Sequence, residues 1–128
     1  MEAEHYYGVS YHPRDKFYLA NVAYKHKHYW LKTWDTAYKA AQVRDVAARW
    51  LKGTLTKLND LPTGDLPEGV TEAVIARWLI DAGVPLRVLV YRVPMAILSA
   101  AGITEYQLLQ AGVSAGRILK FKEETTNT

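Results

Sequence analysis

Cysteine is absent from the 128 residues. The chain therefore forms no disulfide and offers no thiolate to a metal or a nucleophilic site, which fits a cytoplasmic location. Long apolar stretches are also lacking, so we expect neither a transmembrane span nor a signal peptide and no membrane partner. At this length the chain is one domain or two small ones with a real core.

Motifs of catalysis are lacking as well. The sequence shows no glycine-rich phosphate loop, no Glu flanked by metal-ligand His, and no His and Asn spaced as in a metal-finger nuclease. We therefore expect no enzyme and no cofactor. His26 and His28 would point to one side of a strand, but no Cys and no suitably placed carboxylate completes a tetrahedral zinc site, so we expect no metal.

Positive charge is concentrated in one half of the chain. Residues 1–59 hold ten Lys and Arg against five Asp and Glu, a net charge of +5, whereas residues 60–128 hold six against eight, a net charge of −2. The first half therefore carries the field that would attract a polyanion such as DNA.

Alternating and helical periodicities in that half predict an α+β fold. Apolar residues alternate with others over residues 6–11, 17–24 and 28–34, and polar breaks separate these runs, which indicates a three-stranded antiparallel sheet. Asp35 and Thr36 supply a helix N-cap, alanines recur at three- and four-residue spacing over residues 37–52, and Gly53 provides the stop. The alanine stripe lets this helix pack closely on the sheet.

Strand alternation also predicts which side chains face the helix. We expect an inner face of Val9, Tyr11, Tyr18, Ala20, Val22, Tyr29 and Leu31, and an outer face of Ser10, His12, Leu19, Asn21, Ala23, His28, Trp30 and Lys32. An outward Trp among His, Asn and Lys is not a core pattern. Such a face could enter a DNA major groove, where Asn and His meet base edges, Trp and Leu meet thymine methyls, and Lys or Arg hold phosphates. Alternatively, a second part of the chain or a partner subunit could cover it.

A set of dispersed motifs resembles one known family. The motifs are Tyr6-x-Gly8-Val9, Trp30-Leu31, Trp34-Asp35-Thr36-Ala37, Ala40-Ala41, Arg44-Asp45-x-Ala47-Ala48, Gly53 and Leu58-Asn59. In order and spacing they resemble the Apetala-two/ethylene-response-factor DNA-binding domain over residues 6–59. The Gly8-Val9-Ser10-Tyr11 opening and the first turn look more like the prokaryotic and phage versions than the plant ones. The resemblance implies a sheet that binds duplex DNA in the major groove, with the helix behind it.

The resemblance implies, position by position, that the residues contacting DNA bases or backbone are Tyr7, Ser10, His12, Asn21, Ala23, His28, Trp30 and, on the helix, Arg44. Further phosphate partners around the sheet are Arg14, Lys16, Lys25, Lys27 and Lys32. Where the plant family has Arg, this chain has other residues at most of these places, so the Arg-to-guanine code that gives the family GC-rich sites is largely absent. Trp30, His28 and His12 are the leading candidates. Arg44 could equally be a solvated helix residue paired with an acid.

The second half is predicted to be helical. We expect a domain over residues 1–60, a linker at 61–69, a small all-helical region at 70–122 and a flexible tail at 123–128. Residues 79–85, 98–104 and 108–114 repeat one pattern of helix end, Gly, apolar residue and new N-cap. Residues 107–121 fit a helix-turn-helix template, although a helical bundle, a homodimer contact or a protein-partner contact fits the same pattern. Residues 86–91 could form a strand or start a helix.

Together these features predict a non-catalytic duplex DNA-binding protein, a phage or bacterial transcriptional regulator that reads the major groove with its sheet. The alternative is a structural or adaptor subunit of a nucleoprotein or phage assembly that uses the sheet for protein or RNA packing.

Overall fold

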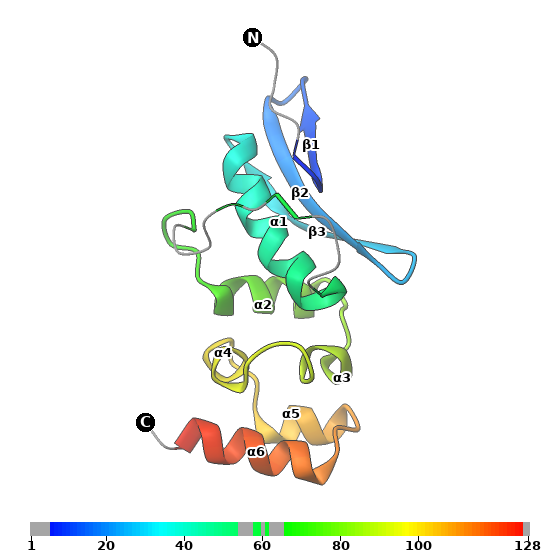
Figure 1. The fold of residues 1–128 in the computed structure, drawn as a ribbon, viewed down its shortest axis with the longest axis vertical. Helices are drawn as coiled ribbons and strands as arrows, with labels where there is room; N and C mark the ends of the chain where they lie inside the picture. The colour runs from blue at the N-terminus through cyan, green and yellow to red at the C-terminus, as the bar shows by residue number, and fades with distance from the viewer. Residues whose placement is uncertain (1–5, 54–57, 60, 62–65, 127–128) are drawn as a thin grey trace. The chain divides into compact units, whose positions relative to one another are not determined.

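The computed structural model describes residues 6–53, 58–59, 61 and 66–126. The chain divides into two compact units, residues 1–71 and residues 72–128. The first contains a sheet and one long helix, and the described part of the second contains helices (Figure 1). This α+β architecture confirms the predicted fold class. The division falls after Thr71, whereas the sequence predicts a linker at residues 61–69 before a helical region that begins at residue 70, and residues 62–65 of that linker lie outside the described residues.

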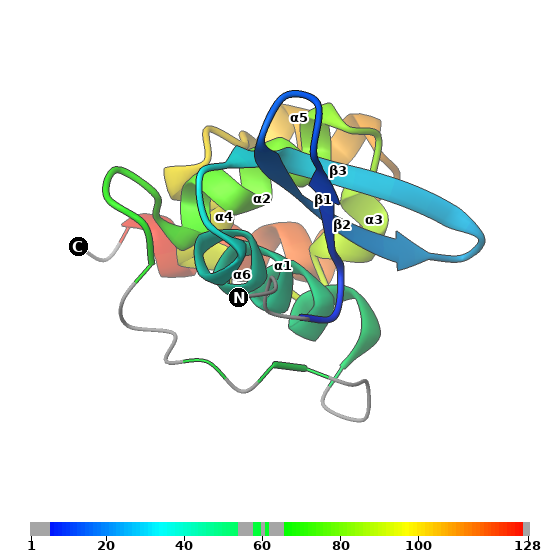
Figure 2. The same cartoon turned by 90° about the horizontal axis from the view of Figure 1, so that it is seen from above.

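The sheet is an antiparallel meander of three strands in the order β1-β2-β3. Its strands are β1 (Val9–His12), β2 (Phe17–Tyr24) and β3 (Lys27–Trp34). Lys25 and His26 join β2 to β3 with positive φ angles of 49° and 66°. Two left-handed residues in a two-residue loop match the twist of a hairpin. The β2–β3 hairpin therefore extends as a regular ribbon beyond the helix (Figure 2).

Helix α1 (Ala37–Lys52) covers the inner face of the sheet (Figure 1). The Thr36 hydroxyl accepts a hydrogen bond from the Lys39 amide at 3.2 Å and caps the first turn. Gly53, with φ of 80°, ends the helix and donates its amide to the Arg49 carbonyl. The alanine stripe is fully buried, as are the sheet residues of the same core; these are Ala40, Ala41, Ala47, Ala48, Ala20, Val22 and Leu31. Methyl groups let helix and sheet approach closely, so the predicted packing is confirmed.

The second unit consists of five short helices in its described part. These are α2 (Glu72–Asp81), α3 (Leu86–Leu89), α4 (Met95–Ala100), α5 (Glu105–Gln110) and α6 (Ala115–Thr126). The segment that could be a strand or a helix start is helix α3. Helix α6 continues through residues predicted to be a flexible tail, and only residues 127–128 of that tail lie outside the described part. No described helix is long and apolar enough to cross a membrane.

The sequence repeat of the second unit has one structural cause, a helix end that recurs three times. At the end of α4 the Gly102 amide donates to the Ser99 carbonyl and the Ile103 amide donates to the Leu98 carbonyl, at 3.0 and 3.1 Å. This pair of bonds is the Schellman motif, which requires the left-handed conformation that Gly102 adopts at φ of 93°. The same bonds recur at Gly83 and Val84 and at Gly112 and Val113. The apolar residue after each glycine is buried, so each motif ties a helix end to the core.

Candidate nucleic-acid interface

The register of the strands defines the outer face of the sheet. Residues directly opposite each other in a ladder project from the same face. The outer face therefore carries the rows Ser10–Leu19–Thr33, His12–Phe17, Asn21–Trp30 and Ala23–His28. The other face carries the buried side chains Ala20, Val22, Tyr29 and Leu31. The predicted alternation is thus confirmed over most of the sheet.

Aromatic and imidazole rings dominate the accessible part of this face. Trp30 is 53% exposed, and His28 lies beside it with the ring centroids 5.9 Å apart and the planes 20° from parallel. His12 stacks on Phe17 across the β1–β2 ladder at 4.8 Å. His12 and His28 are both exposed. The three leading candidate residues, Trp30, His28 and His12, therefore lie on one face, as the sequence predicted.

A β-bulge in β3 changes the alternation near the end of the strand. Leu31 and Lys32 together oppose Ala20, and Lys32 has a φ of 70°. After the bulge Thr33, not Lys32, pairs with Leu19 on the outer face. The placement of Lys32 among the regularly alternating outer residues was therefore wrong, although Lys32 remains exposed.

Two residues of the outer face were not predicted, and one residue of the inner face is less buried than predicted. Phe17 belongs to the outer face, two positions before Leu19, and simple alternation could have found it. Thr33 reaches that face only through the bulge. Tyr11 was predicted to pack inward but is 45% exposed, with its ring on that of Tyr18 at 4.7 Å. It lies near the end of a short edge strand, where there is less inner surface to cover it.

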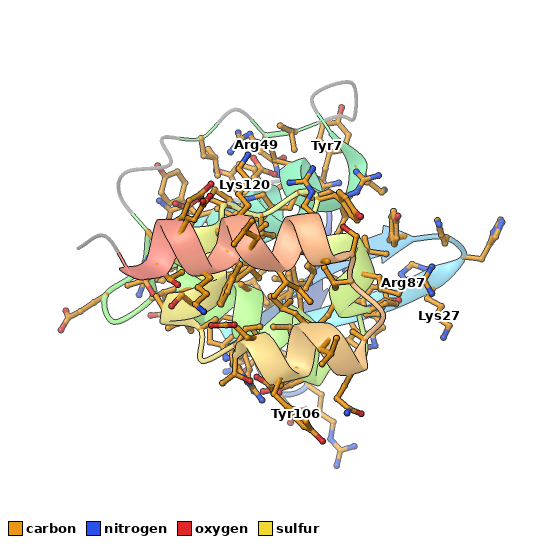
Figure 3. All side chains as sticks on the ribbon, turned by 90° about the horizontal axis from the view of Figure 1, so that it is seen from below. Tyr7, Lys27, Arg49, Arg87, Tyr106 and Lys120 are labelled. Atoms are coloured by element: carbon orange, nitrogen blue, oxygen red, sulfur yellow. The ribbon has the colours of Figure 1, made fainter. Side chains whose placement is uncertain are left out.

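Cations lie at the turns and at the bulge. Arg14 and Lys16 belong to the β1–β2 turn, and Lys25 and Lys27 lie at the tip of the β2–β3 hairpin, where Figure 3 shows the Lys27 side chain. With Lys32 these five side chains are exposed, and the only acidic residue between positions 6 and 34 is Asp15. We call Arg14, Lys16, Lys25, Lys27 and Lys32 the rim cations. Their placement suits contacts with phosphates on either side of a groove.

Arg44 does not belong to this surface. It is only 6% exposed, and its Nη1 donates to Asp45 Oδ1 at 3.2 Å. It lies directly against Gly8, where a Cβ would collide with the Arg44 side chain and where φ is 75°. A phosphate cannot reach a guanidinium buried in this way, so we correct the predicted DNA contact: Arg44 has a structural position. The alternative prediction, a solvated Arg44 paired with an acid, is right about the pairing, since Asp45 is the partner, and wrong about the solvation, since both side chains are buried.

Tyr7 and Asn21 are tied to the same corner of the sheet. Asn59 accepts from the Tyr7 amide at 2.8 Å and donates to its carbonyl at 3.1 Å, while Asp45 accepts two 2.8 Å bonds from Asn59. The Tyr7 side chain itself is exposed. The Asn21 amide nitrogen donates to the Gly8 carbonyl at 3.3 Å, so part of its donor capacity serves the sheet. Gly8, Arg44, Asp45 and Asn59, which we call the corner cluster, thus position the start of β1.

The second unit has a separate basic and aromatic surface. A hollow of about 390 Å³ is lined by Pro85, Arg87, Val88, Tyr91, Gly112, Val113 and Ser114. The Arg117 guanidinium lies 4.5 Å from the centroid of the exposed Tyr91 ring. Lys120 follows on α6 and approaches Glu124 at 3.9 Å (Figure 3). In the helix-turn-helix template α6 would be the recognition helix, with Ile118 half-buried, and that role stays a prediction.

Metal ligands do not gather in the described residues. Across residues 6–53, 58–59, 61 and 66–126, no group of three or more His, Asp or Glu side chains is placed to hold an ion. Comparison of the chain with protein-family models and with curated proteins found no match. The resemblance to the Apetala-two/ethylene-response-factor domain therefore stays a prediction.

Proposed function

We propose that this protein binds duplex DNA by placing the outer face of its sheet in the major groove, and that it acts as a phage or bacterial transcriptional regulator. The observation that carries the proposal is the pairing of an accessible face of Trp30, His28 and His12 with exposed cations at its turns. A core face would bury such side chains, whereas Trp30, His28 and His12 are exposed. Helix α1 covers most of the opposite face, so the outer face is the one proposed to bind a ligand.

Charge and width support this assignment. Neighbouring strands lie about 4.8 Å apart, so three strands form a ribbon about 10 Å across, and the major groove is about 12 Å wide. The rim cations then lie near the phosphates while the strand side chains face the bases. Backbone contacts of this kind fix orientation, and base contacts give specificity.

Selection of the purified chain against a random duplex library tests the proposal. We expect an enriched motif, and we expect Trp30→Ala combined with His28→Ala to abolish its selective binding without unfolding the protein. Tyr11→Ala is the matched control, because it removes an exposed aromatic ring from the other face. No enrichment and no binding would reject DNA as the ligand and favour an adaptor role for the sheet.

The second unit offers a contact for a second copy. Tyr106 and Leu109 are 68% and 63% exposed and lie three residues apart on α5, hence on one side of that helix. We include in the proposal that this apolar pair contributes to a homodimer, since paired half-sites are the usual way in which small DNA readers gain affinity. Sedimentation equilibrium should show a concentration-dependent dimer for the wild type and a monomer for Leu109→Asp. A wild-type monomer at all concentrations would contradict this part.

A further inference from the structure

On the outer face, the side chains of the strands, which we call the floor, differ in kind from the rim cations around them. The floor consists of the side chains that the ladder places on that face: Ser10, His12, Phe17, Leu19, Asn21, Ala23, His28, Trp30 and Thr33. No Lys or Arg occurs among these positions in the three described strands. All five rim cations lie in turns, at the hairpin tip or at the bulge. Positive charge is thus available to phosphates, but the floor meets a base edge with aromatic, apolar and short polar groups.

Base pairs differ in the hydrogen-bonding and apolar groups that they present in the major groove. In the major groove guanine presents two acceptors, N7 and O6, and its commonest protein partner is a bidentate Arg or Lys. Thymine presents the C5-methyl group, the one apolar feature of the groove, and its partners are apolar side chains. A floor without guanidinium or ammonium groups lacks the strongest guanine contact. Its apolar members instead match the thymine methyl.

Trp30 and Leu19 are the floor residues best placed for that contact. Trp30 is half exposed, and the ring of its neighbour His28 lies nearly parallel to it at 5.9 Å, so the indole presents an accessible apolar surface above the strands. Its cross-strand partner Asn21 directs the amide nitrogen toward Gly8, so Trp30 is the more accessible member of that row. Leu19 is half-buried in the next row, flanked by Ser10 and Thr33.

We infer that the sheet selects A·T-rich major grooves and recognises thymine through its C5-methyl group, with Trp30 as the principal contact and Leu19 as the second. The inference rests on the proposed binding of duplex DNA. It reverses the base preference that the family resemblance alone would imply, because the guanine-contacting arginines of that family are replaced here. His12 and His28 complete the floor as hydrogen-bonding groups for the neighbouring base edges.

Deoxyuridine provides the test, since it pairs as thymine does but lacks the methyl group. The duplex selected from a random library is resynthesised with each thymine replaced in turn by deoxyuridine, and affinity is measured by fluorescence anisotropy. Burial of one methyl or methylene group is worth about 0.8 kcal/mol, so each contacted position should lose about fourfold in affinity. We expect an A·T-rich motif with such a loss at one position or more.

A double-mutant cycle assigns the methyl to a side chain. In Trp30→Ala the ratio of thymine to deoxyuridine affinity at the contacted position should fall from about four to about one, because the partner of the methyl is gone. Tyr11→Ala should leave that ratio unchanged. Circular dichroism and thermal unfolding confirm that each variant is folded before its affinity is interpreted.

The outcomes separate this inference from the proposed function. A G·C-rich motif, or an A·T-rich motif whose affinity is insensitive to deoxyuridine everywhere, overturns methyl recognition while duplex binding stands. A deoxyuridine effect that persists undiminished in Trp30→Ala overturns the assignment to Trp30. Absence of duplex binding overturns the inference and the proposed function together.

Discussion

The salt dependence of DNA affinity tests the rim cations quantitatively. If each of the five exposed cations neutralises one phosphate, the plot of log affinity against log salt should have a slope of about −4.5, since each contact in duplex DNA contributes about −0.9. Raising salt from about 50 to about 200 mM would then lower the affinity about 500-fold. Removing both hairpin-tip charges with Lys25→Gln and Lys27→Gln leaves three contacts. The slope should become about −2.7 and the loss about 40-fold.

Fluorescence anisotropy of one labelled duplex over a KCl series measures these slopes. Lys52→Gln is the matched control, because it removes one exposed positive charge from α1, the helix that covers the other face of the sheet. Its slope should equal that of the wild type. A wild-type slope in the hairpin-tip variant, or an equal loss of slope per charge removed in Lys52→Gln, would contradict phosphate contacts by the rim cations.

Three further predictions concern stability and titration. Asp45→Ala should cost about 3–5 kcal/mol in urea unfolding because it leaves the buried Arg44 charge without this carboxylate. Asp35→Ala breaks only the exposed pair with Lys39 and should cost much less; equal costs would contradict the burial of Arg44 and Asp45. His26→Gly should raise the unfolding free energy by roughly 0.5–1 kcal/mol, because the left-handed strain that it relieves, about 1–2 kcal/mol, exceeds the cost of the extra conformational entropy that glycine gives the unfolded chain. His12→Gly in β1 should lower the unfolding free energy, because no such strain is relieved there. The Lys39 hydrogen bond holds the pKa of Asp35 below its ordinary value of 3.8. The stabilising contribution of this pair is therefore present above that value and is lost as pH falls through the folded pKa. An NMR titration of Lys39→Met should show the Asp35 pKa rising, and an unchanged pKa would remove Lys39 as the cause.

The sequence predicts those parts of the fold that are specified by residues within a single segment. Helix α1 begins and ends where expected because its cap at Thr36, its alanine spacing and its stop at Gly53 all lie within the segment itself. The outer positions of Trp30 and His28 follow from strand alternation for the same reason. The bulge at Lys32 was not predictable, because its left-handed residue is a Lys where a Gly would have been the usual signal.

Burial of Arg44 depends on residues that are distant in the chain. Gly8 supplies the space for its side chain, and Asp45 is held in turn by Asn59, whose other partner Tyr7 is 52 positions away. A helix pattern alone places Arg44 and Asp45 on a helix but not against the start of β1. The sequence therefore placed the candidate strand residues largely on the correct face of the sheet, whereas it placed the helical residue Arg44 on the surface although it is buried.

Under the proposed DNA binding, the corner cluster explains how the fold can be kept while the target sequence changes. Several positions that carry the family resemblance, including Gly8, Ala40, Asp45 and Asn59, are those that seal the helix onto the sheet or fix the start of β1. Most floor residues, by contrast, project from the face opposite helix α1, so they can change without altering the packing of helix on sheet. Asn21 is the exception, because its side chain donates to the Gly8 carbonyl. A chain can therefore keep the spacing of the scaffold motifs and present a different floor to DNA. For this reason the floor, through Trp30 and Leu19, is the part from which base preference has to be inferred.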